Sequence, residues 1–441
     1  SIHLCGVHIL LLAANHTAPL ASLHEAVVRG LAPDRGLYMP ERIRKLPAEF
    51  FDHIDSMSFQ EIAYHVADAF FGEDIPADRL KQIVYDTLSF PCPVKSVEDR
   101  IFSLELFHGP TLAFKDVGAR FMARMLQYFI HEEGTKEVNV LVATSGDTGS
   151  AVANGFLGVD GIRVFVLYPK GKVSAIQESQ FTTLGQNIIA IEVDGVFDDC
   201  QALVKQAFMD DDLCHHMKLT SANSINVARF LPQAFYYFHA YAQLKRMGKA
   251  DNFVVCVPSG NFGNITAAIF ARQMGLPIKR FIAANNANDV VCQYLQTGNY
   301  APRPSVQTIA NAMDVGDPSN FARISDLFHA DWQQIRSLMS GAAYTDEQIR
   351  HTMRHCYEAN HYVLDPHGAC AYQALKDLLA DDEVGVFGET AHPVKFKETV
   401  ESAINAEIDI PERLAAFMKG KKQSVSMSKK FSDFKQLLMA E

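Results

Sequence analysis

Short apolar runs recur between residues 138 and 390, and most are followed by a polar loop and then by an amphipathic stretch with helical spacing. Because continuous apolar strands that alternate with helices are typical of parallel sheets covered on both faces, we predict an α/β fold with two such sheets. The runs predicted to be strands are 138–143, 163–168, 187–193, 253–257, 278–284 and 383–387.

The order of the predicted helices and strands also suggests where the domains begin and end. At 441 residues the chain is too long for one ordinary core. Helical patterns at 20–30, 58–70 and 77–89 precede the regular α/β part, and a Lys- and Ser-rich stretch follows it, which we expect to be loose before a final short helix. We therefore predict an N-terminal domain (1–95), a large α/β domain (96–137 and 250–410), a small α/β domain (138–249) and a C-terminal tail (411–441).

Composition narrows the function classes. The net charge of −11 argues against nucleic acid as a partner. The apolar run in residues 1–16 is far shorter than the roughly 20 residues of a membrane span and lacks the marks of a signal peptide, so we predict a buried strand and no membrane partner. None of the eight cysteines forms a C-x-x-C pair, which suggests reduced core thiols and a cytoplasmic location.

A lysine at the start of a predicted helix is the first candidate for chemistry. Lys115 lies between Phe114 and Asp116, and the residues after it carry an amphipathic pattern for which Asp116 is a good N-cap. Partial burial lowers the pKa of a lysine, and a neutral amine can form a Schiff base. From these residues alone, a surface lysine beside its own cap is the simpler interpretation.

Two loops lie between a predicted strand and a helix, where ligands of parallel sheets bind. Residues 259–264 (SGNFGN) offer backbone N–H groups and a helix N-terminus to a phosphate, although they match neither the Walker pattern nor G-x-G-x-x-G, and a plain tight turn is the alternative. Residues 144–150 (TSGDTGS) suit a carboxylate or a phosphate, with ordinary helix capping as the alternative.

Three further features are weaker. Thr390 follows a strand and could meet a ring nitrogen, or simply cap the helix expected from Pro393. Residues 221–226 (SANSIN) with Arg229 could bind a carboxylate or phosphate, or form a polar surface turn. The pair His351 and His355 has no evident third ligand and no H-E-x-x-H pattern, so we expect no metal.

Six motifs, in order, resemble those of the threonine synthase family of pyridoxal 5'-phosphate (PLP) enzymes: LELFHGPTLAFKD, ATSGDTGSAVANGF, SANSIN, VPSGNFGN, NAMDV and ETAHPVKFKE. The resemblance runs from about residue 20 to about residue 410, whereas residues 1–15 depart from the family. It implies the α/β fold of tryptophan synthase β (fold type II), with PLP between two parallel-sheet α/β domains and a smaller N-terminal domain.

The resemblance also assigns roles. Lys115 would hold PLP as a Schiff base and move protons. The PLP phosphate would be bound by Gly260, Asn261, Phe262, Gly263 and Asn264, and its pyridine nitrogen by Thr390. The carboxylate of the substrate would lie near Ser145, Gly146, Asp147 and Thr148. Its phosphate would lie near Asn223, Ser224, Asn226 and Arg229.

The implied reaction is the last step of threonine biosynthesis, in which a carbon–oxygen lyase converts O-phospho-L-homoserine and water to L-threonine and phosphate. The alternatives are a PLP-dependent phospho-lyase or dehydratase of the same fold, a PLP-binding relative without synthase activity and, more distantly, a sugar- or nucleotide-phosphate binder without PLP. We expect a monomer or a homodimer whose small domain closes on the substrate.

Overall fold

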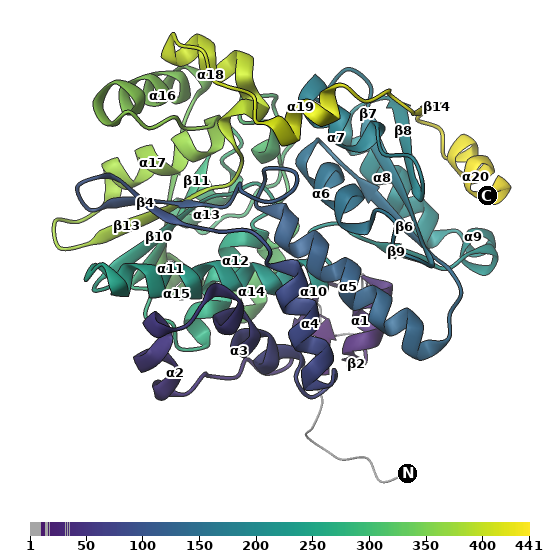
Figure 1. Ribbon diagram of the computed structural model, residues 1–441, viewed down its shortest axis with the longest axis horizontal. Helices are drawn as coiled ribbons and strands as arrows, with labels where there is room; N and C mark the ends of the chain where they lie inside the picture. The colour runs from purple at the N-terminus through teal and green to yellow at the C-terminus, as the bar shows by residue number, and fades with distance from the viewer. Residues whose placement is uncertain (1–9, 14–15, 17, 31, 33, 35) are drawn as a thin grey trace.

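The computed structural model describes residues 10–13, 16, 18–30, 32, 34 and 36–441, and this part of the chain contains three sheets (Figure 1). The six-stranded sheet is parallel except for β4, which pairs antiparallel with β5. Its strand order is β12 (Met339–Ala343), β11 (Arg280–Asn285), β10 (Phe253–Pro258), β13 (Val384–Glu389), β5 (Ile101–Glu105) and β4 (Val94–Glu98).

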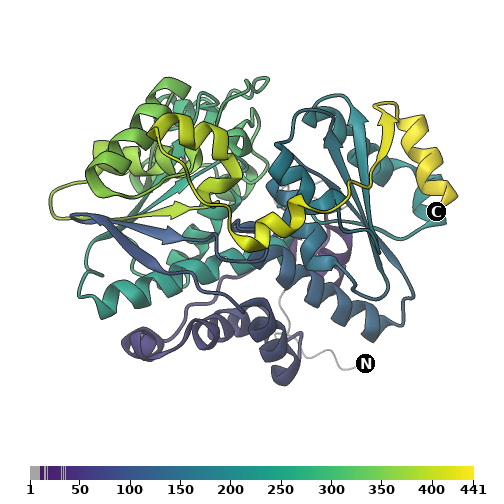
Figure 2. The ribbon, with the colours of Figure 1, turned by 45° about the horizontal axis from the view of Figure 1, so that its top comes forward.

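The five-stranded sheet is parallel throughout and forms a second lobe, which Figure 2 shows beside the first. Its order is β14 (Val425–Ser428), β8 (Ile188–Asp194), β7 (Ile162–Pro169), β6 (Val138–Ala143) and β9 (Leu219–Ser221). All six predicted strands are confirmed, as β6, β7, β8, β10, β11 and β13. The prediction missed β4, β5, β9, β12 and β14, several of which are short or partly exposed and so carry no continuous apolar run.

The N-terminal helices are confirmed within a few residues as α1 (Leu23–Arg29), α3 (Phe59–Phe71) and α4 (Ala77–Thr87), with α2 (Ala48–His53) in addition. They accompany a small antiparallel sheet of β2 (Ala21–Ser22), β1 (Leu10–Ala13) and β3 (Tyr38–Pro40). The strand expected within residues 1–16 corresponds to β1 at residues 10–13, and most of the segment that departs from the family, residues 1–9, 14 and 15, lies outside the described residues.

The prediction of a loose C-terminal tail is wrong. The chain runs through α19 (Glu412–Met418) from one lobe to the other, and β14 then extends the small sheet by pairing with β8 (Figures 1 and 2). The last helix, α20 (Phe431–Ala440), packs against α8 (Phe197–Met209) and buries Phe434 and Leu438 completely. These two side chains are four residues apart and so form one apolar face of α20.

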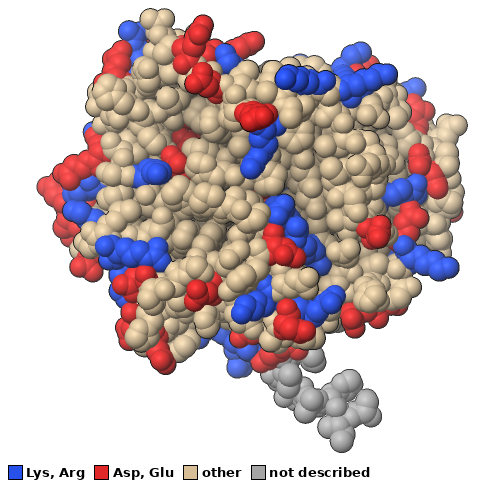
Figure 3. All heavy atoms as spheres, in the orientation of Figure 1, with Lys and Arg blue, Asp and Glu red and all other residues tan. Residues whose placement is uncertain are grey.

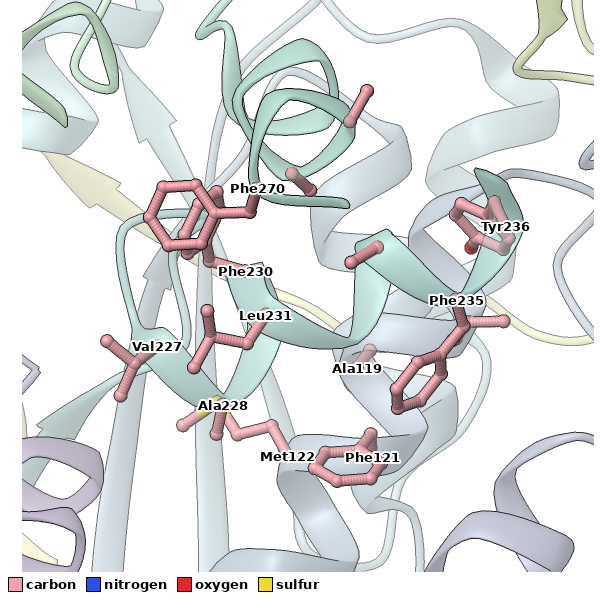
Figure 4. Packing of buried hydrophobic residues seen from close by; sticks show 14 of the residues in the cluster. Ala119, Phe121, Met122, Val227, Ala228, Phe230, Leu231, Phe235, Tyr236 and Phe270 are labelled. Atoms are coloured by element: carbon pink, nitrogen blue, oxygen red, sulfur yellow. The ribbon is translucent and has the colours of Figure 1, made fainter. Parts of the chain in front are cut away.

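The proposed division into domains remains a prediction, but the helices between the two sheets show how the lobes are joined. The segment α10 (Val227–Phe230), η2 (Leu231–Ala234) and α11 (Phe235–Arg246) packs on α12 (Gly263–Gln273) and on α5 (Lys115–Glu133) (Figure 4). Phe230 meets Phe270 at a ring distance of 5.1 Å, and Phe235 meets Phe121 at 5.8 Å. These edge-to-face contacts hold α5, the helix that begins with Lys115, in a dry core.

The closest approach in this core depends on a glycine. A Cβ atom on Gly118 of α5 would lie 2.6 Å from the carbonyl oxygen of Arg229 in α10, so a larger residue would push the two helices apart. On the surface shown in Figure 3, acidic and basic side chains are interspersed. Among the described residues, no helix is long and apolar enough to cross a membrane.

Candidate functional site

The helix α5 begins at Lys115, so the prediction that Asp116 caps it is wrong. The N-cap position is Phe114, whose backbone N–H donates to the carbonyl oxygen of Thr390 at 2.8 Å. Asp116 lies inside the first turn, where its buried carboxylate accepts from the backbone N–H of Thr111 at 2.9 Å and from the Thr111 hydroxyl at 2.5 Å. The helix therefore begins earlier than the capping pattern predicted, directly after the residue whose backbone is bonded to Thr390.

The amine of Lys115 is half-buried and donates to the hydroxyl of Thr148 at 2.8 Å. Burial lowers its pKa to about 8, against the opposing charge of Asp147 and with the help of the positive charges of Arg229 and Lys395. A lysine with this pKa is partly neutral near physiological pH, which a nucleophilic or proton-accepting amine requires.

The loop 144–150 turns sharply into α6 (Asp147–Phe156). The hydroxyl of Thr144 accepts from the backbone N–H groups of Gly146 at 2.9 Å and Gly149 at 2.7 Å. Gly146 has φ +145°, and a Cβ atom there would lie 2.5 Å from the side chain of Gln177. A larger residue would therefore not fit at Gly146, while Ser145 and Thr148 in the same loop are partly exposed.

Asp147 is buried and paired. Its carboxylate lies 2.5 Å from the ammonium nitrogen of Lys395 and accepts from the Gln177 side-chain amide at 3.1 Å. Burial alone would raise the pKa of Asp147, but the positive charges of Lys395 and Lys115 bring it below its ordinary value. Its carboxylate is thus an anion that faces lysines.

The loop 259–264 joins β10 to α12 and approaches a neighbouring loop very closely. A Cβ atom on Gly260 would lie 2.4 Å from the carbonyl oxygen of Ala312, so only glycine fits there. Phe262 has a left-handed backbone (φ +65°) and is the N-cap of α12, which begins at Gly263. The loop lies between the carboxyl end of β10 and the N-terminus of α12, a position that is typical of phosphate-binding loops.

Two buried asparagines provide a test of whether this loop suits a phosphate. The Oδ1 atom of Asn264 accepts from the hydroxyl of Tyr237, and that of Asn320 accepts from the guanidinium of Arg323 at 2.6 Å. The Nδ2 atoms of both asparagines have no hydrogen-bond partner among the described residues. The Asn320 Nδ2 atom lies 3.3 Å from the position of a Cβ on Gly263. Two orphaned donors beside a helix N-terminus fit a bound phosphate group.

Thr390 follows β13 and is nearly fully buried. Its neighbour Glu389 has no exposed surface, and burial together with the charge of Asp365 raises the pKa of Glu389 far above its ordinary value. Burial and the charge of Asp365 thus both favour the protonated form of the Glu389 carboxyl group.

In the segment 221–229, some polar side chains are fully hydrogen-bonded within the protein, whereas others keep a polar atom that could bind a ligand. Asn226 caps α10: its Nδ2 atom donates to the carbonyl oxygens of Val27 at 2.9 Å and Ser221 at 3.0 Å, and its Oδ1 atom accepts from the backbone N–H of Ala228. Its side chain is fully used within the protein. Arg229 is buried and donates to the carbonyl oxygen of Ala222 at 2.7 Å, while its Nε atom has no partner among the described residues.

Sequence reasoning missed three side chains that lie at this site: Gln177, Asn320 and Lys395. Lys395 lies in the motif ETAHPVKFKE among other charged residues, and the sequence alone gives no sign that its side chain is buried. In the structure its side chain has no exposed surface. Burial of a lysine depends on a partner that is distant in sequence, and no local pattern reveals it. In the described part of the chain, no three His, Cys, Asp or Glu side chains are grouped to hold a metal.

Comparison with family models covers almost the whole chain. Residues 87–386 match the model described as "Pyridoxal-phosphate dependent enzyme", residues 13–88 match "Threonine synthase N terminus", and residues 368–438 match "Threonine synthase, C-terminal". The chain is 45% identical to the threonine synthase of Serratia marcescens, with 95% of this chain and 96% of the relative covered. It is 46% identical to that of Escherichia coli K12, over 89% and 91%.

Solved structures agree. The crystal structure of threonine synthase from Escherichia coli superposes with a TM-score of 0.92 at 43% identity, covering 98% of this chain and 100% of that one. The PLP-bound threonine synthase from Brucella melitensis superposes with a TM-score of 0.90 at 33% identity, covering 98% and 99%. Maize serine racemase, at 18% identity and a TM-score of 0.53, shares the fold. The predicted fold type and family resemblance are confirmed.

Proposed function

The chain belongs to the threonine synthase family of PLP-dependent enzymes, and from this premise we propose that it converts O-phospho-L-homoserine and water to L-threonine and phosphate, the last step of threonine biosynthesis. The observation that carries the proposal is the amine of Lys115. It has a pKa of about 8 and bonds to Thr148 in the loop 144–150. Lys115 is also the first residue of α5, and the N-cap residue of this helix, Phe114, donates its backbone N–H to the carbonyl oxygen of Thr390.

Lys115 is proposed to hold the cofactor and, once the substrate amine has displaced it, to move protons. Its amine takes the proton from the substrate Cα and later one from Cβ, and it needs to be neutral each time it accepts a proton. PLP, when bound, supplies the electron sink that stabilises negative charge on the substrate. The bond from Cγ to the phosphate oxygen breaks and phosphate leaves, Cγ gains a proton to become the methyl group of threonine, water adds at Cβ, and Cα receives a proton again.

The loops around Lys115 are proposed to bind the two charged ends of each ligand. Gly260, Asn261, Phe262, Gly263 and Asn264 hold the cofactor phosphate, and the unpartnered Nδ2 atom of Asn264 supports this role. Ser145, Gly146 and Thr148 receive the carboxylate of the substrate. The carboxylate of Asp147 is already bound to Lys395, so we propose that Asp147 contributes its place at the start of α6 rather than a direct contact.

The other end of the substrate carries a phosphate, for which Asn223, Ser224 and Arg229 remain the proposed ligands. The buried guanidinium of Arg229 has an unpartnered Nε atom among the described residues, which supports its availability. Thr390 is proposed to meet the pyridine nitrogen with a neutral hydroxyl. A neutral hydroxyl partner does not require that nitrogen to be protonated.

The experiment that tests this function is an absorption spectrum of the purified protein, recorded before and after addition of O-phospho-L-homoserine, with phosphate and threonine assayed together. A visible band that shifts on addition of substrate, with equal amounts of phosphate and threonine, is the expected result. Phosphate without threonine indicates a phospho-lyase, and 2-oxobutyrate formed from threonine indicates a dehydratase. No visible band after addition of PLP would contradict the role of Lys115.

We further propose a reducing, cytoplasmic location and a monomer or homodimer. All seven cysteines in the described part of the chain are free, and six of them are buried, which supports a reducing compartment. Light scattering of the purified protein distinguishes the two assembly states. Small-angle scattering with and without substrate analogue tests the proposed closure of the small lobe, since identical profiles would contradict it.

A further inference from the structure

We propose that Lys395 is a positioning residue that fixes Asp147, and with it the turn that carries Thr148, beside the amine of Lys115. The inference rests on the proposed role of Lys115 and adds a residue outside its immediate contacts. Lys395 lies on the 3₁₀ helix η4 (Pro393–Phe396), which follows β13 of the large sheet, whereas Asp147 begins α6 beside the small sheet. The pair therefore joins the two lobes at the catalytic lysine.

The ammonium group of Lys395 is bound to two oxygen atoms of the protein. Its nitrogen lies 2.5 Å from the Oδ1 atom of Asp147 and donates to the carbonyl oxygen of Thr111 at 2.9 Å. The side chain of Lys395 has no exposed surface, and that of Asp147 is only 6% exposed. Charges buried to this extent need their partners, and removal of one partner leaves the other uncompensated.

The partners of this ion pair are themselves held from the small lobe. Gln177 donates its side-chain amide to Asp147 at 3.1 Å, and Gln180 donates to the carbonyl oxygen of Thr111 at 3.1 Å. Both glutamines lie on α7 (Ala175–Thr182). Thr111 is therefore bound by Lys395 and Gln180 on one side and by Asp116 on the other. The loop before Lys115 and the loop after β6 form one hydrogen-bonded unit.

The charges that act on the Lys115 amine come from three different elements: Asp147 on α6, Arg229 on α10 and Lys395 on η4. Asp147 favours the protonated amine, and the two cations oppose it. Asp116, on the helix of Lys115, and His392, beside η4, also lie within the electrostatic reach of Lys395. Removing the charge of Lys395 leaves only Arg229 to oppose Asp147, whereas removing the charge of Asp147 exposes Lys115 to two cations.

These opposite effects define the experiment. The visible absorbance of the holoenzyme is titrated with pH without substrate, because this band follows protonation of the Lys115 nitrogen bound to the cofactor. We expect the midpoint of Lys395→Met to rise and that of Asp147→Asn to fall, each by about one pH unit. The double variant, neutral at both positions, should titrate close to the wild type. The pH profile of kcat/KM should move in the same directions.

A matched control is Lys397→Met, two residues further on, whose partly buried amine pairs with Glu401 on its own helix and should leave the midpoint unchanged. Equal midpoints in all variants, with lower thermal stability in the Lys395 and Asp147 variants alone, would reduce the pair to a structural role and overturn the inference. If Lys395→Met does not fold, Asp147→Asn and the double variant still decide. Failure of the proposed role of Lys115 is distinguishable, because the wild type would then form no visible band. Failure of the synthase reaction alone would show as missing threonine in the product assay, while the titration of the band would still test the pair.

Discussion

The backbone N–H of Phe114 donates to the carbonyl oxygen of Thr390 at 2.8 Å, and the backbone N–H of His392 donates to the carbonyl oxygen of Leu112 at 3.0 Å. These two bonds flank an antiparallel bridge between Ala113 and Ala391. The loop that carries the lysine and the loop proposed to meet the cofactor ring are thus joined by backbone hydrogen bonds.

Replacement of Lys115 by Ala should reduce formation of threonine by at least about a thousandfold, because the same amine is proposed to bind the cofactor and to transfer protons. The measurement is the coupled assay of phosphate and threonine, with PLP content determined by absorbance. Replacement of Lys172, an exposed lysine in a turn, is a control that should keep full activity. Substantial threonine formation by the Lys115 variant would contradict the assignment.

The pKa of Lys115 predicts how uptake of PLP depends on pH. Because burial lowers this pKa to about 8, the neutral amine predominates above pH 8 and is lost as the pH falls below it. The rate at which the PLP-free protein takes up PLP should therefore rise with pH and level off above about pH 8. Stopped-flow absorbance measures this rate. A rate that continues to rise to pH 10, as for an ordinary lysine, would be inconsistent with the buried amine.

Replacement of Gly260 by Ala should weaken binding of PLP and destabilise the protein by about 1–3 kcal/mol. The added Cβ would lie 2.4 Å from the backbone oxygen of Ala312, so one of the two loops has to move. Gly388→Ala is the matched control, since a Cβ there has its nearest neighbour at 3.6 Å. Thermal unfolding and a PLP titration check both variants, and equal behaviour of the two would argue against close loop packing at Gly260.

Replacement of Asn264 by Leu should weaken binding of PLP by roughly ten- to a hundredfold, because a hydrogen bond to a charged group contributes about 1.5–3 kcal/mol. The Oδ1 atom of Asn264 is occupied by Tyr237, which leaves the Nδ2 atom for the phosphate. Pyridoxal, which lacks the phosphate, is the control ligand. Its affinity should change much less, and equal losses for the two ligands would point to a general disturbance of the site.

Glu383 offers a test of stability against pH. Its carboxylate accepts two hydrogen bonds from Arg280, at 2.7 and 2.9 Å, and these bonds lower its pKa from 4.5 to about 2. The folded-state pKa is depressed, so this stabilisation is present above pH 4.5 and is lost as the pH falls toward 2. Glu383→Gln should therefore cost about 1–3 kcal/mol at pH 7, and the difference from the wild type should narrow below pH 4.5.

The control for Glu383 is Glu358→Gln. Glu358 pairs with Arg354 on the same helix, with both side chains 61% exposed, and such a pair contributes at most about 0.5 kcal/mol. Urea unfolding at several pH values measures both variants. A difference for Glu383→Gln that is independent of pH would mean that its charge does not provide the stabilisation.

Local chemistry was enough to recognise much of the site. The strand runs and the positions of the loops 144–150 and 259–264 follow from patterns that neighbouring residues share, because strands, turns and helix starts are governed by adjacent side chains, whereas Lys115 was singled out only with the family resemblance. The motif order led to the family, which the comparisons confirm. Predictions that depended on a single capping residue were weaker, and Asp116 shows why: its carboxylate bonds to Thr111 instead of a helix end.

The sequence by itself determined the class of fold and the family, and it supplied the proposal that Lys115 is the reactive amine, since each rests on short motifs of neighbouring residues. Only the tertiary structure decided which charges surround that amine. Lys395 and Asp147 are 248 positions apart in the printed sequence, and they meet because the two lobes lie against each other. Similarly, β14 joins β8 from the far end of the chain. Burial and long-range pairing depend on the whole fold, so no local pattern specifies them.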